Sequence, residues 1–346
     1  MFIWNTFLQY YIFGEEEMKK KVIAVNRLEK EAKEMMQDKV DLSFFPNIDS
    51  LENEVFLAEL QEAEGLINLD LNVNKQLLDH APKLKIVSNV SVGYNNLDID
   101  ELTKRNIMAT NTPGVLDDTV ADAIFGLLIA TARRIPELDH YVKARKWTEK
   151  LTSDKYGVDV HHKTLGIIGM GRIGQAIAHR AHFGFHMNIL YHNRSRKPEA
   201  EKKYNAEYRS LDDLLKESDF VVLMTPLTKE TEGMIGAREF SLMKETAIFI
   251  NGSRGKTIVE KDLIEALQTK KIAAAGLDVF EKEPVEPDNP LLDMPNVVTL
   301  PHIGSSTYAT ELKMSLLACE NVLAGLNGEK PPNLINESVW ENIKKQ

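Results

Sequence analysis

The sequence predicts an α/β protein with two domains, each built on a parallel β-sheet covered by helices. The chain has 346 residues, which is enough for about two domains of roughly 150 residues each. Short apolar runs alternate with charged, helix-like segments in two separate sets, and this alternation is typical of parallel strands joined by helices. Apolar residues make up 43% of the chain and charged residues 27%, so a globular protein with sizeable cores is expected.

The first set of apolar runs predicts five strands in the N-terminal part of the chain. The runs are VIAV (22–25), DLSFF (41–45), GLINL (65–69), LKIVSNV (84–90) and IMATN (107–111). Helices are predicted between some of them, at 28–39 and 73–80. The turn-forming sequence NTPG at 111–114 predicts a hinge after the last of these strands.

A long apolar segment, VADAIFGLLIATARRI at 120–135, separates the two sets. It is apolar around most of its circumference but too short and too interrupted by charge to span a membrane. This pattern indicates a buried helix and makes it a candidate for a subunit contact. Pro136 is expected to end or kink the helix, with a second helix running to about Lys146.

Six further apolar runs predict the sheet of the second domain. They are TLGIIG (164–169), NILYHN (188–193), FVVLMTP (220–226), AIFING (247–252), AAAGLDV (273–279) and VVTLPH (297–302). One more helix is predicted at about 310–326. The short tail that contains this helix is too small to be a domain, so it is expected to pack on the first one.

Charge and cysteine content exclude several classes of protein. The net charge of −10 argues against a general nucleic-acid-binding or anionic-membrane surface. The single cysteine, Cys319, excludes an internal disulfide framework and suits a reducing cytoplasm. Residues 1–17 lack the basic region and the cleavage site of a signal peptide. We expect Met18 to be the native start and 1–17 to be an upstream extension; the alternative is a docked structural segment.

A glycine motif follows the first strand of the second set and begins a helix. It reads Gly169-x-Gly171-x-x-Gly174, with Arg172 and Ile173 between the last two glycines. Strand, glycine turn and helix together are the context that binds a dinucleotide, because the glycines let the pyrophosphate approach the positive end of the helix. The alternative is a structural glycine turn.

Polar or permissive residues follow nearly every strand of the second set. Ligands of open α/β sheets bind beyond the carboxyl ends of the strands, so these residues predict one crevice. They are Gly169, Asn193, Thr225, Pro226, Asn251, Gly252, Ser253, Arg254, Asp278, Pro301 and His302. The sequence GKT at 255–257 looks like the end of a phosphate-binding P-loop, but that motif needs glycine at position 250, where Ile250 stands.

Four of these motifs together resemble the D-isomer-specific 2-hydroxyacid dehydrogenase family, over about residues 22–336. They are GMGRIG (169–174), NGSRG (251–255), GLDVFEKEP (276–284) and PHIGSST (301–307). The match is closest to the bacterial glyoxylate/hydroxypyruvate reductase and 2-ketogluconate reductase branch. The resemblance implies a flavodoxin-like substrate domain (18–116 with 306–346) and an inserted Rossmann dinucleotide-binding domain (117–305).

The resemblance also assigns a catalytic set. Arg254 is the expected ligand of the 2-keto acid, since a guanidinium forms planar paired hydrogen bonds with such oxygens. His302 is the expected acid/base, and Glu283 its carboxylate partner, which favours the charged imidazole. Asp278, and with it Thr119, is expected to contact the carboxamide of the nicotinamide. The alternatives are a surface ion pair for Arg254, a satisfied core histidine for His302 and a solvated loop charge for Glu283.

The loop SNVSVGYNNLD at 88–98 matches the substrate loop of the family. Backbone N–H groups near Val92 and Gly93 are expected to bind the substrate carboxylate, with Gly93 allowing close approach. A plain strand-to-helix turn is the alternative. No metal is expected, because the histidines at 161, 162, 179, 182 and 186 supply no convergent ligand set with carboxylates.

The segment YHNRSRK at 191–197 predicts the cofactor. NAD-preferring domains place a carboxylate about 20 residues beyond the glycines to bind the ribose 2′-hydroxyl. Here Asn193 stands at that position, and Arg194, Ser195 and Arg196 follow it. The sequence therefore predicts NADP, with NAD as the weaker cofactor. Solvated surface arginines are the alternative.

The predicted function is a cytoplasmic oxidoreductase that reduces glyoxylate, hydroxypyruvate or 2-ketogluconate to the D-2-hydroxy acid. By resemblance it is expected to be a homodimer through its cofactor domains. The alternative from another class is a dinucleotide-sensing corepressor on the same fold. The C-terminal tail distinguishes the two classes. Corepressors carry long disordered ends that bind partners, whereas this chain is expected to end soon after its last helix.

Overall fold

The structure is a computed structural model, which describes residues 19–48 and 51–345. The expectation about residues 1–17 lies outside these residues. The contacts divide the chain into two compact units. The first contains the described residues up to Val90, Asn96–Thr110 and Ala318 onward; the second contains Ser91–Asn95 and Asn111–Leu317. The predicted boundaries at 116/117 and 305/306 stay predictions.

The first unit holds a five-stranded parallel sheet in the order β2-β1-β3-β4-β5. Its strands are β1 (Lys21–Val25), β2 (Asp41–Phe45), β3 (Gly65–Asn68), β4 (Ile86–Asn89) and β5 (Met108–Thr110). Each of the five apolar runs thus forms a strand, as predicted. The sheet buries its apolar side chains against helices in a core that includes Ile23, Phe56, Leu66, Leu77 and Val87.

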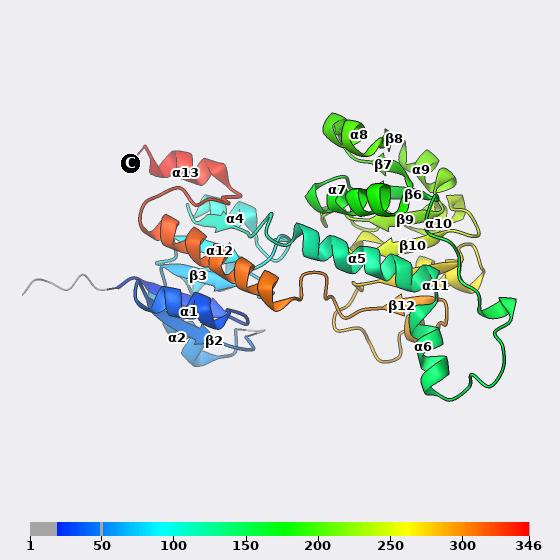
Figure 1. Cartoon of the computed structure of the whole chain (residues 1–346). Coiled ribbons are helices and arrows are strands. Elements are labelled where there is room, and N and C mark those ends of the chain that lie inside the picture. The colour runs from blue at the N-terminus through cyan, green and yellow to red at the C-terminus, as the bar shows by residue number, and fades with distance from the viewer. Residues whose placement is uncertain (1–18, 49–50, 346) are drawn as a thin grey trace, which may run out of the picture. The chain divides into compact units, whose positions relative to one another are not determined.

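The helices of the first unit include three that the sequence did not predict. The chain forms α1 (Lys30–Gln37), α2 (Glu54–Glu62), α3 (Lys75–Asp79), α4 (Ile99–Lys104) and α13 (Glu337–Ile343), and α12 (Tyr308–Leu326) runs into this unit (Figure 1). The three that were not predicted are α2, α4 and α13. α2 begins where the side chain of Asn53 accepts a hydrogen bond from the Phe56 N–H, and α4 where Asp98 accepts one from Glu101. These side-chain caps satisfy amide groups that the first helical turn leaves without a partner.

The second unit holds a seven-stranded parallel sheet in the order β12-β11-β10-β9-β6-β7-β8. Its strands are β6 (Thr164–Ile168), β7 (Asn188–His192), β8 (Glu207–Tyr208), β9 (Phe220–Leu223), β10 (Ile248–Asn251), β11 (Ala274–Leu277) and β12 (Val297–Thr299). All six predicted runs are strands, and the two-residue β8 is an addition. The order reverses at β6, which makes the sheet doubly wound.

Helices cover both faces of this sheet. α5 (Asp117–Ala132) and α7 (Arg172–His179) pack against each other, and α5 also lies on β10 and β11 (Figure 1). On the other face, α9 (Leu211–Glu217), α10 (Ala237–Leu242) and α11 (Glu260–Gln268) share one apolar core with the strands. The five-residue π-helical turn Arg180–Gly184 follows α7, and α8 (Pro198–Tyr204) precedes β8. A 3₁₀ turn (Gly255–Thr257) follows β10.

The long apolar segment forms the predicted helix, but the helix stops earlier. α5 ends at Ala132, and Arg134 takes a left-handed backbone conformation with φ of 55°. Pro136 then lies in the first turn of α6 (Ile135–Lys143), where its missing N–H leaves no hydrogen bond unmade. The proline therefore begins the second helix instead of kinking the first.

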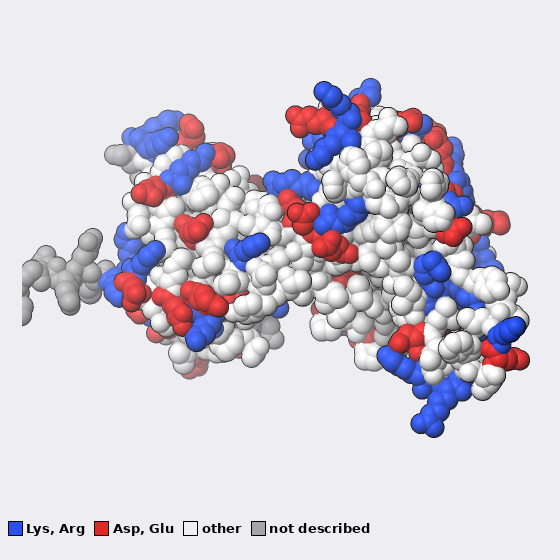
Figure 2. Space-filling view, viewed as in Figure 1, with Lys and Arg blue, Asp and Glu red and all other residues white. Residues whose placement is uncertain are grey.

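Two surface observations bear on the excluded classes. Within residues 19–48 and 51–345, no helix is both long and apolar enough to cross a bilayer. Figure 2 shows basic and acidic side chains interspersed on the face in view, with no broad field of one sign. The observed α/β class, with two parallel sheets, is the one that the sequence predicts.

Candidate active site

The predicted ligand-binding residues lie at one edge of the second sheet. Because every strand of this sheet is parallel to its neighbours, all carboxyl ends point the same way. The residues that follow these ends are therefore brought to a common edge. This set comprises Gly169 after β6, Asn193–Arg196 after β7, Thr225 and Pro226 after β9, Gly252–Arg254 after β10, Asp278 after β11 and His302 after β12.

The glycine turn has the geometry that a dinucleotide needs. Gly169 has φ of +104°, a conformation that residues with a side chain rarely adopt. A Cβ at Gly174 would lie 2.2 Å from the carbonyl oxygen of Gly169, so only glycine fits there. A Cβ at Gly171 would meet no atom within 4 Å, which leaves the start of α7 open to a ligand. The turn thus fits a pyrophosphate at the positive end of a helix.

The other residues of the turn have mixed surroundings. Arg172 is exposed, and its Nε lies 3.4 Å from a carboxylate oxygen of Asp117. Burial raises the pKa of Asp117, while the charge of Arg172 lowers it in part. Ile173 is half-buried on the first turn of α7. The hydroxyl of Thr119, on the first turn of α5, lies 2.6 Å from the hydroxyl of Thr310.

His302 and Glu283 form a hydrogen-bonded pair. Nδ1 of His302 lies 2.7 Å from a carboxylate oxygen of Glu283, and the other carboxylate oxygen accepts a hydrogen bond from the Phe280 N–H. The hydrogen bond to Glu283 raises the pKa of His302 above its ordinary value, against the effect of burial. Burial alone would raise the pKa of Glu283, but the hydrogen bonds from His302 and Phe280 bring it below its ordinary value.

Asp278 fixes the turn that carries His302. Its two carboxylate oxygens accept hydrogen bonds from the backbone N–H groups of Ile303 (2.8 Å) and Gly304 (2.9 Å). His302 itself has φ of +54°, an uncommon conformation for a residue with a side chain, and the two hydrogen bonds hold the turn just after it. Asp278 is 2% exposed, and burial raises its pKa. Sequence reasoning assigned Asp278 to the cofactor and missed this contact with the histidine turn.

Arg254 extends from the loop after β10 toward the segment Ser91–Asn95. Its Nη1 donates a hydrogen bond to the carbonyl oxygen of Ser253 (2.7 Å), and its Nε donates one to Oδ1 of Asn95 (3.3 Å). A Cβ at Gly93 would lie 2.0 Å from Nη2 of Arg254, so glycine at 93 leaves room for the guanidinium. Asn95 is a contact that sequence reasoning missed, although it lies in the loop that was singled out.

The loop that carries Arg254 is held by buried polar groups. The side-chain oxygen of Asn251 accepts hydrogen bonds from the N–H and hydroxyl of Ser253, and the Ser253 hydroxyl lies 3.1 Å from that of Thr257. Gly255 can only be glycine, because a Cβ there would lie 1.7 Å from the carbonyl oxygen of Phe280. This contact packs the Arg254 loop against the strand end that leads to Glu283.

The segment after β7 presents the side chains predicted to select the cofactor. Arg194, Ser195 and Arg196 are exposed, and Asn193 is half-buried, with its side-chain amide donating to the Ser195 carbonyl oxygen (3.1 Å). Arg196 makes a paired contact with Glu201. Among the described residues, Arg194 makes no hydrogen bond or ion pair.

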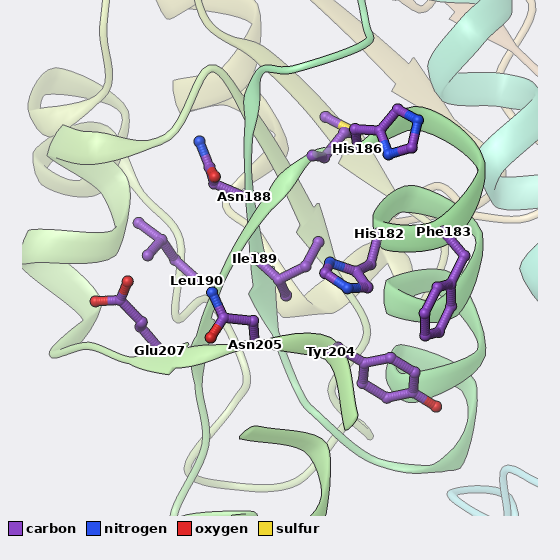
Figure 3. Close-up of a pocket in the computed structure, with 10 residues that line it drawn as sticks. His182, Phe183, His186, Asn188, Ile189, Leu190, Tyr204, Asn205 and Glu207 are labelled. Carbon is purple, nitrogen blue, oxygen red and sulfur yellow. The ribbon is translucent and has the colours of Figure 1, made fainter. Parts of the chain in front are cut away.

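A cavity lined by two of the histidines lies away from the predicted crevice. In the part of the chain that the structure describes, no cluster of three metal-ligating side chains occurs. A cavity of about 250 Å³ is lined by His182, His186 and Tyr204 among others (Figure 3). Asn188 and Ile189 also line it, and these residues begin β7. The cavity therefore lies by the amino end of that strand, away from the predicted crevice.

Known proteins share both the sequence and the fold. The model of the D-isomer specific 2-hydroxyacid dehydrogenase NAD-binding domain matches residues 125–304. Glyoxylate/hydroxypyruvate reductase B of Escherichia coli is 49% identical over 322 residues, which cover 93% of this chain and 99% of that protein.

Two solved structures extend the likeness. The NADPH-dependent glyoxylate/hydroxypyruvate reductase of Sinorhizobium meliloti, in complex with NADP and malonate, superposes with a TM-score of 0.82 at 29% identity, covering 92% of this chain and 98% of that one. D-lactate dehydrogenase of Aquifex aeolicus, complexed with NAD and lactic acid, has a TM-score of 0.82 at 28% identity, with 91% and 99% covered. The chain belongs to the D-isomer specific 2-hydroxyacid dehydrogenase family and is an NAD(P)-dependent oxidoreductase.

Proposed function

We propose that the chain reduces a small 2-keto acid, glyoxylate, hydroxypyruvate or 2-ketogluconate, to the D-2-hydroxy acid with NADPH. The observation that carries the proposal is the His302–Glu283 pair at 2.7 Å, held at the same sheet edge as Arg254 and the glycine turn. The relatives that bear the reductase name support the substrate class.

In this proposal His302 supplies the proton. When bound, the nicotinamide cofactor provides the hydride for the carbonyl carbon, so the carbonyl oxygen must gain a proton. The Nδ1–H of His302 donates to Glu283, which leaves Nε2 as the nitrogen that can donate to the substrate. The anionic partner keeps the imidazole protonated to higher pH, and this favours proton donation to the carbonyl oxygen.

Arg254 binds and orients the keto acid. Its guanidinium is planar and permanently charged, which suits the adjacent carboxylate and carbonyl oxygens of a 2-keto acid. Backbone N–H groups of the segment that includes Val92 and Gly93 bind the substrate carboxylate. The hydrogen bond from Nε to Asn95 fixes the orientation of the guanidinium next to that segment.

NADPH is preferred because no carboxylate stands at position 193 and basic side chains follow it. Charge-assisted hydrogen bonds contribute roughly 1.5–3 kcal/mol each, so a preference of about tenfold to a few hundredfold over NADH is expected. It should weaken as salt is raised, since the side chains are exposed. Asn193→Asp combined with Arg194→Ala and Arg196→Ala is expected to reverse it.

We also infer a homodimer formed through the cofactor domains, in a reducing, cytoplasmic setting. Support comes from large apolar side chains exposed on and after α6, where a monomer would leave them in water. They are Ile135, Val142, Trp147, Leu151, Tyr156 and Val158, each at least 40% exposed. Light scattering should give twice the chain mass, and replacing Trp147 and Tyr156 by Ser should shift it toward the monomer. A wild-type protein that stays monomeric at micromolar concentration would refute this.

A substrate panel tests the function. Glyoxylate, hydroxypyruvate, 2-ketogluconate and pyruvate are each offered with NADPH and with NADH, and the oxidation of the cofactor is followed. We expect turnover of at least one of the first three, faster with NADPH. Cofactor binding with no turnover of any keto acid would favour the corepressor-like alternative. A ratio of kcat/KM for NADPH over NADH at or below one would overturn the cofactor preference alone.

A further inference from the structure

Glu201 contacts the segment 193–196, which is predicted to select the cofactor. It belongs to α8, and its two carboxylate oxygens accept hydrogen bonds from Nε (3.0 Å) and Nη2 (2.9 Å) of Arg196. This paired geometry is the strongest form of an arginine–carboxylate contact. One complete edge of the Arg196 guanidinium is thereby occupied by a residue of the same chain.

A buried tyrosine fixes the position of Glu201. The hydroxyl of Tyr191, whose residue has no exposed surface, donates a hydrogen bond to Glu201 (2.5 Å) and accepts one from the Lys197 N–H (2.7 Å). Hydrogen bonds from Arg196 and then Tyr191 lower the pKa of Glu201, so its carboxylate is ionised at neutral pH. Glu201 therefore carries a negative charge at neutral pH, and its carboxylate is held between the Tyr191 hydroxyl and the Arg196 guanidinium.

The two arginines of the segment differ in their surroundings. Both side chains are exposed, but Arg196 is paired with Glu201, whereas Arg194 makes no ion pair with any described residue. A dianionic 2′-phosphate that approached the remaining edge of Arg196 would be attracted by the guanidinium and repelled by the nearby Glu201 carboxylate. No described carboxylate pairs with Arg194 in this way. Glu230 interacts with Arg194 only through its charge, so the phosphate meets weaker opposition there.

We propose that Glu201 is a specificity-determining residue. By pairing with Arg196 it weakens the attraction of that guanidinium for the 2′-phosphate, so that Arg194 contributes most of the preference for NADPH over NADH. The proposal rests on the proposed function, because it assumes that the segment 193–196 faces the cofactor ribose. Under the proposal Glu201 also lowers the preference for NADPH, because its negative charge repels the 2′-phosphate.

Four proteins test the proposal: the wild type, Glu201→Gln, Arg196→Ala and the double variant. The dissociation constants of NADP⁺ and NAD⁺ are measured for each by calorimetry, without keto acid. Glu201→Gln should raise the NADP⁺ preference by about two- to tenfold, the range expected for one exposed charge near a dianion. Arg196→Ala should lower it by a similar factor, because the carboxylate is left unpaired. The double variant should return to within about twofold of the wild type.

Controls keep the outcomes distinct. Asp212→Asn removes a carboxylate from another exposed arginine pair of this domain, that with Arg238, and should leave the preference unchanged. Arg194→Ala should lower the preference in both the wild-type and the Glu201→Gln background. A double variant that keeps the full loss of Arg196→Ala would show that Arg196 binds the phosphate itself and overturn the proposal. A fall in preference in Glu201→Gln would overturn it too, because Glu201 would then orient Arg196 toward the phosphate. Because binding is measured without substrate, a failure to reduce keto acids would affect the proposed function alone.

Discussion

Replacing Gly93 with alanine should move Arg254 without unfolding the protein. The added Cβ would lie 2.0 Å from Nη2 and 2.9 Å from Cζ of Arg254. Carbon–nitrogen contact becomes favourable only near about 3.5 Å, so the guanidinium must retreat by about 1.5 Å. A misplacement of about 1 Å at a binding group can cost on the order of 10²-fold in rate. We therefore expect kcat/KM for the keto acid to fall about 10²-fold.

The assay for Gly93→Ala varies glyoxylate at saturating NADPH and measures NADPH affinity separately by fluorescence. The affinity and the Tm should change little, because the displaced atoms are the end of a flexible side chain. Gly126→Ala, on α5, is the matched control, since a Cβ there meets no atom within 4 Å. A value of kcat/KM within about threefold of the wild type would refute the idea that the position of Arg254 governs substrate binding.

The remaining predictions concern the pair and the arginine. His302→Ala should lower kcat by about 10²–10⁴-fold with cofactor affinity unchanged, and near-normal turnover across pH would rule His302 out as the proton donor. Glu283→Gln replaces the charged acceptor that raises the pKa of His302 with a neutral amide, so the imidazole should lose its proton at lower pH. The upper pH limit of the reduction should therefore fall; a limit that stays or rises in the pH–rate profile contradicts the pairing. Arg254→Lys keeps the charge but loses the planar pair of donors, so KM for the keto acid should rise and kcat should fall. Unaltered steady-state kinetics would instead support the alternative that Arg254 only forms a surface ion pair.

The periodicity of apolar residues was sufficient to predict the sheets. Strands such as Ile248–Asn251 are buried on both faces and read as continuous apolar runs bounded by turn residues. The short helix Glu54–Glu62 has a weaker signal, because its start depends on one side-chain cap at Asn53. The two-residue β8 is set by pairing with β7, which no local pattern reveals.

The site could be predicted only as far as residue types and strand order allow. Gly169, Arg254 and His302 follow separate strands, and the parallel sheet is enough to bring them to one edge. The paired contacts of Arg196 with Glu201 and of Asp278 with the turn after His302 depend on side-chain positions. Glu201 looks like any charged residue of a helix, because only the fold shows that the Tyr191 hydroxyl reaches it.

The configuration of the product tests the central claim most directly. The protein is incubated with hydroxypyruvate and NADPH, and the glycerate formed is resolved by chiral chromatography. We predict that the product is D-glycerate, formed in an amount equal to the NADPH oxidised, and that His302→Ala reduces its rate of formation by the factor stated above. Formation of L-glycerate, or NADPH binding without any glycerate, would contradict the assignment of this chain as a D-2-hydroxyacid-forming reductase.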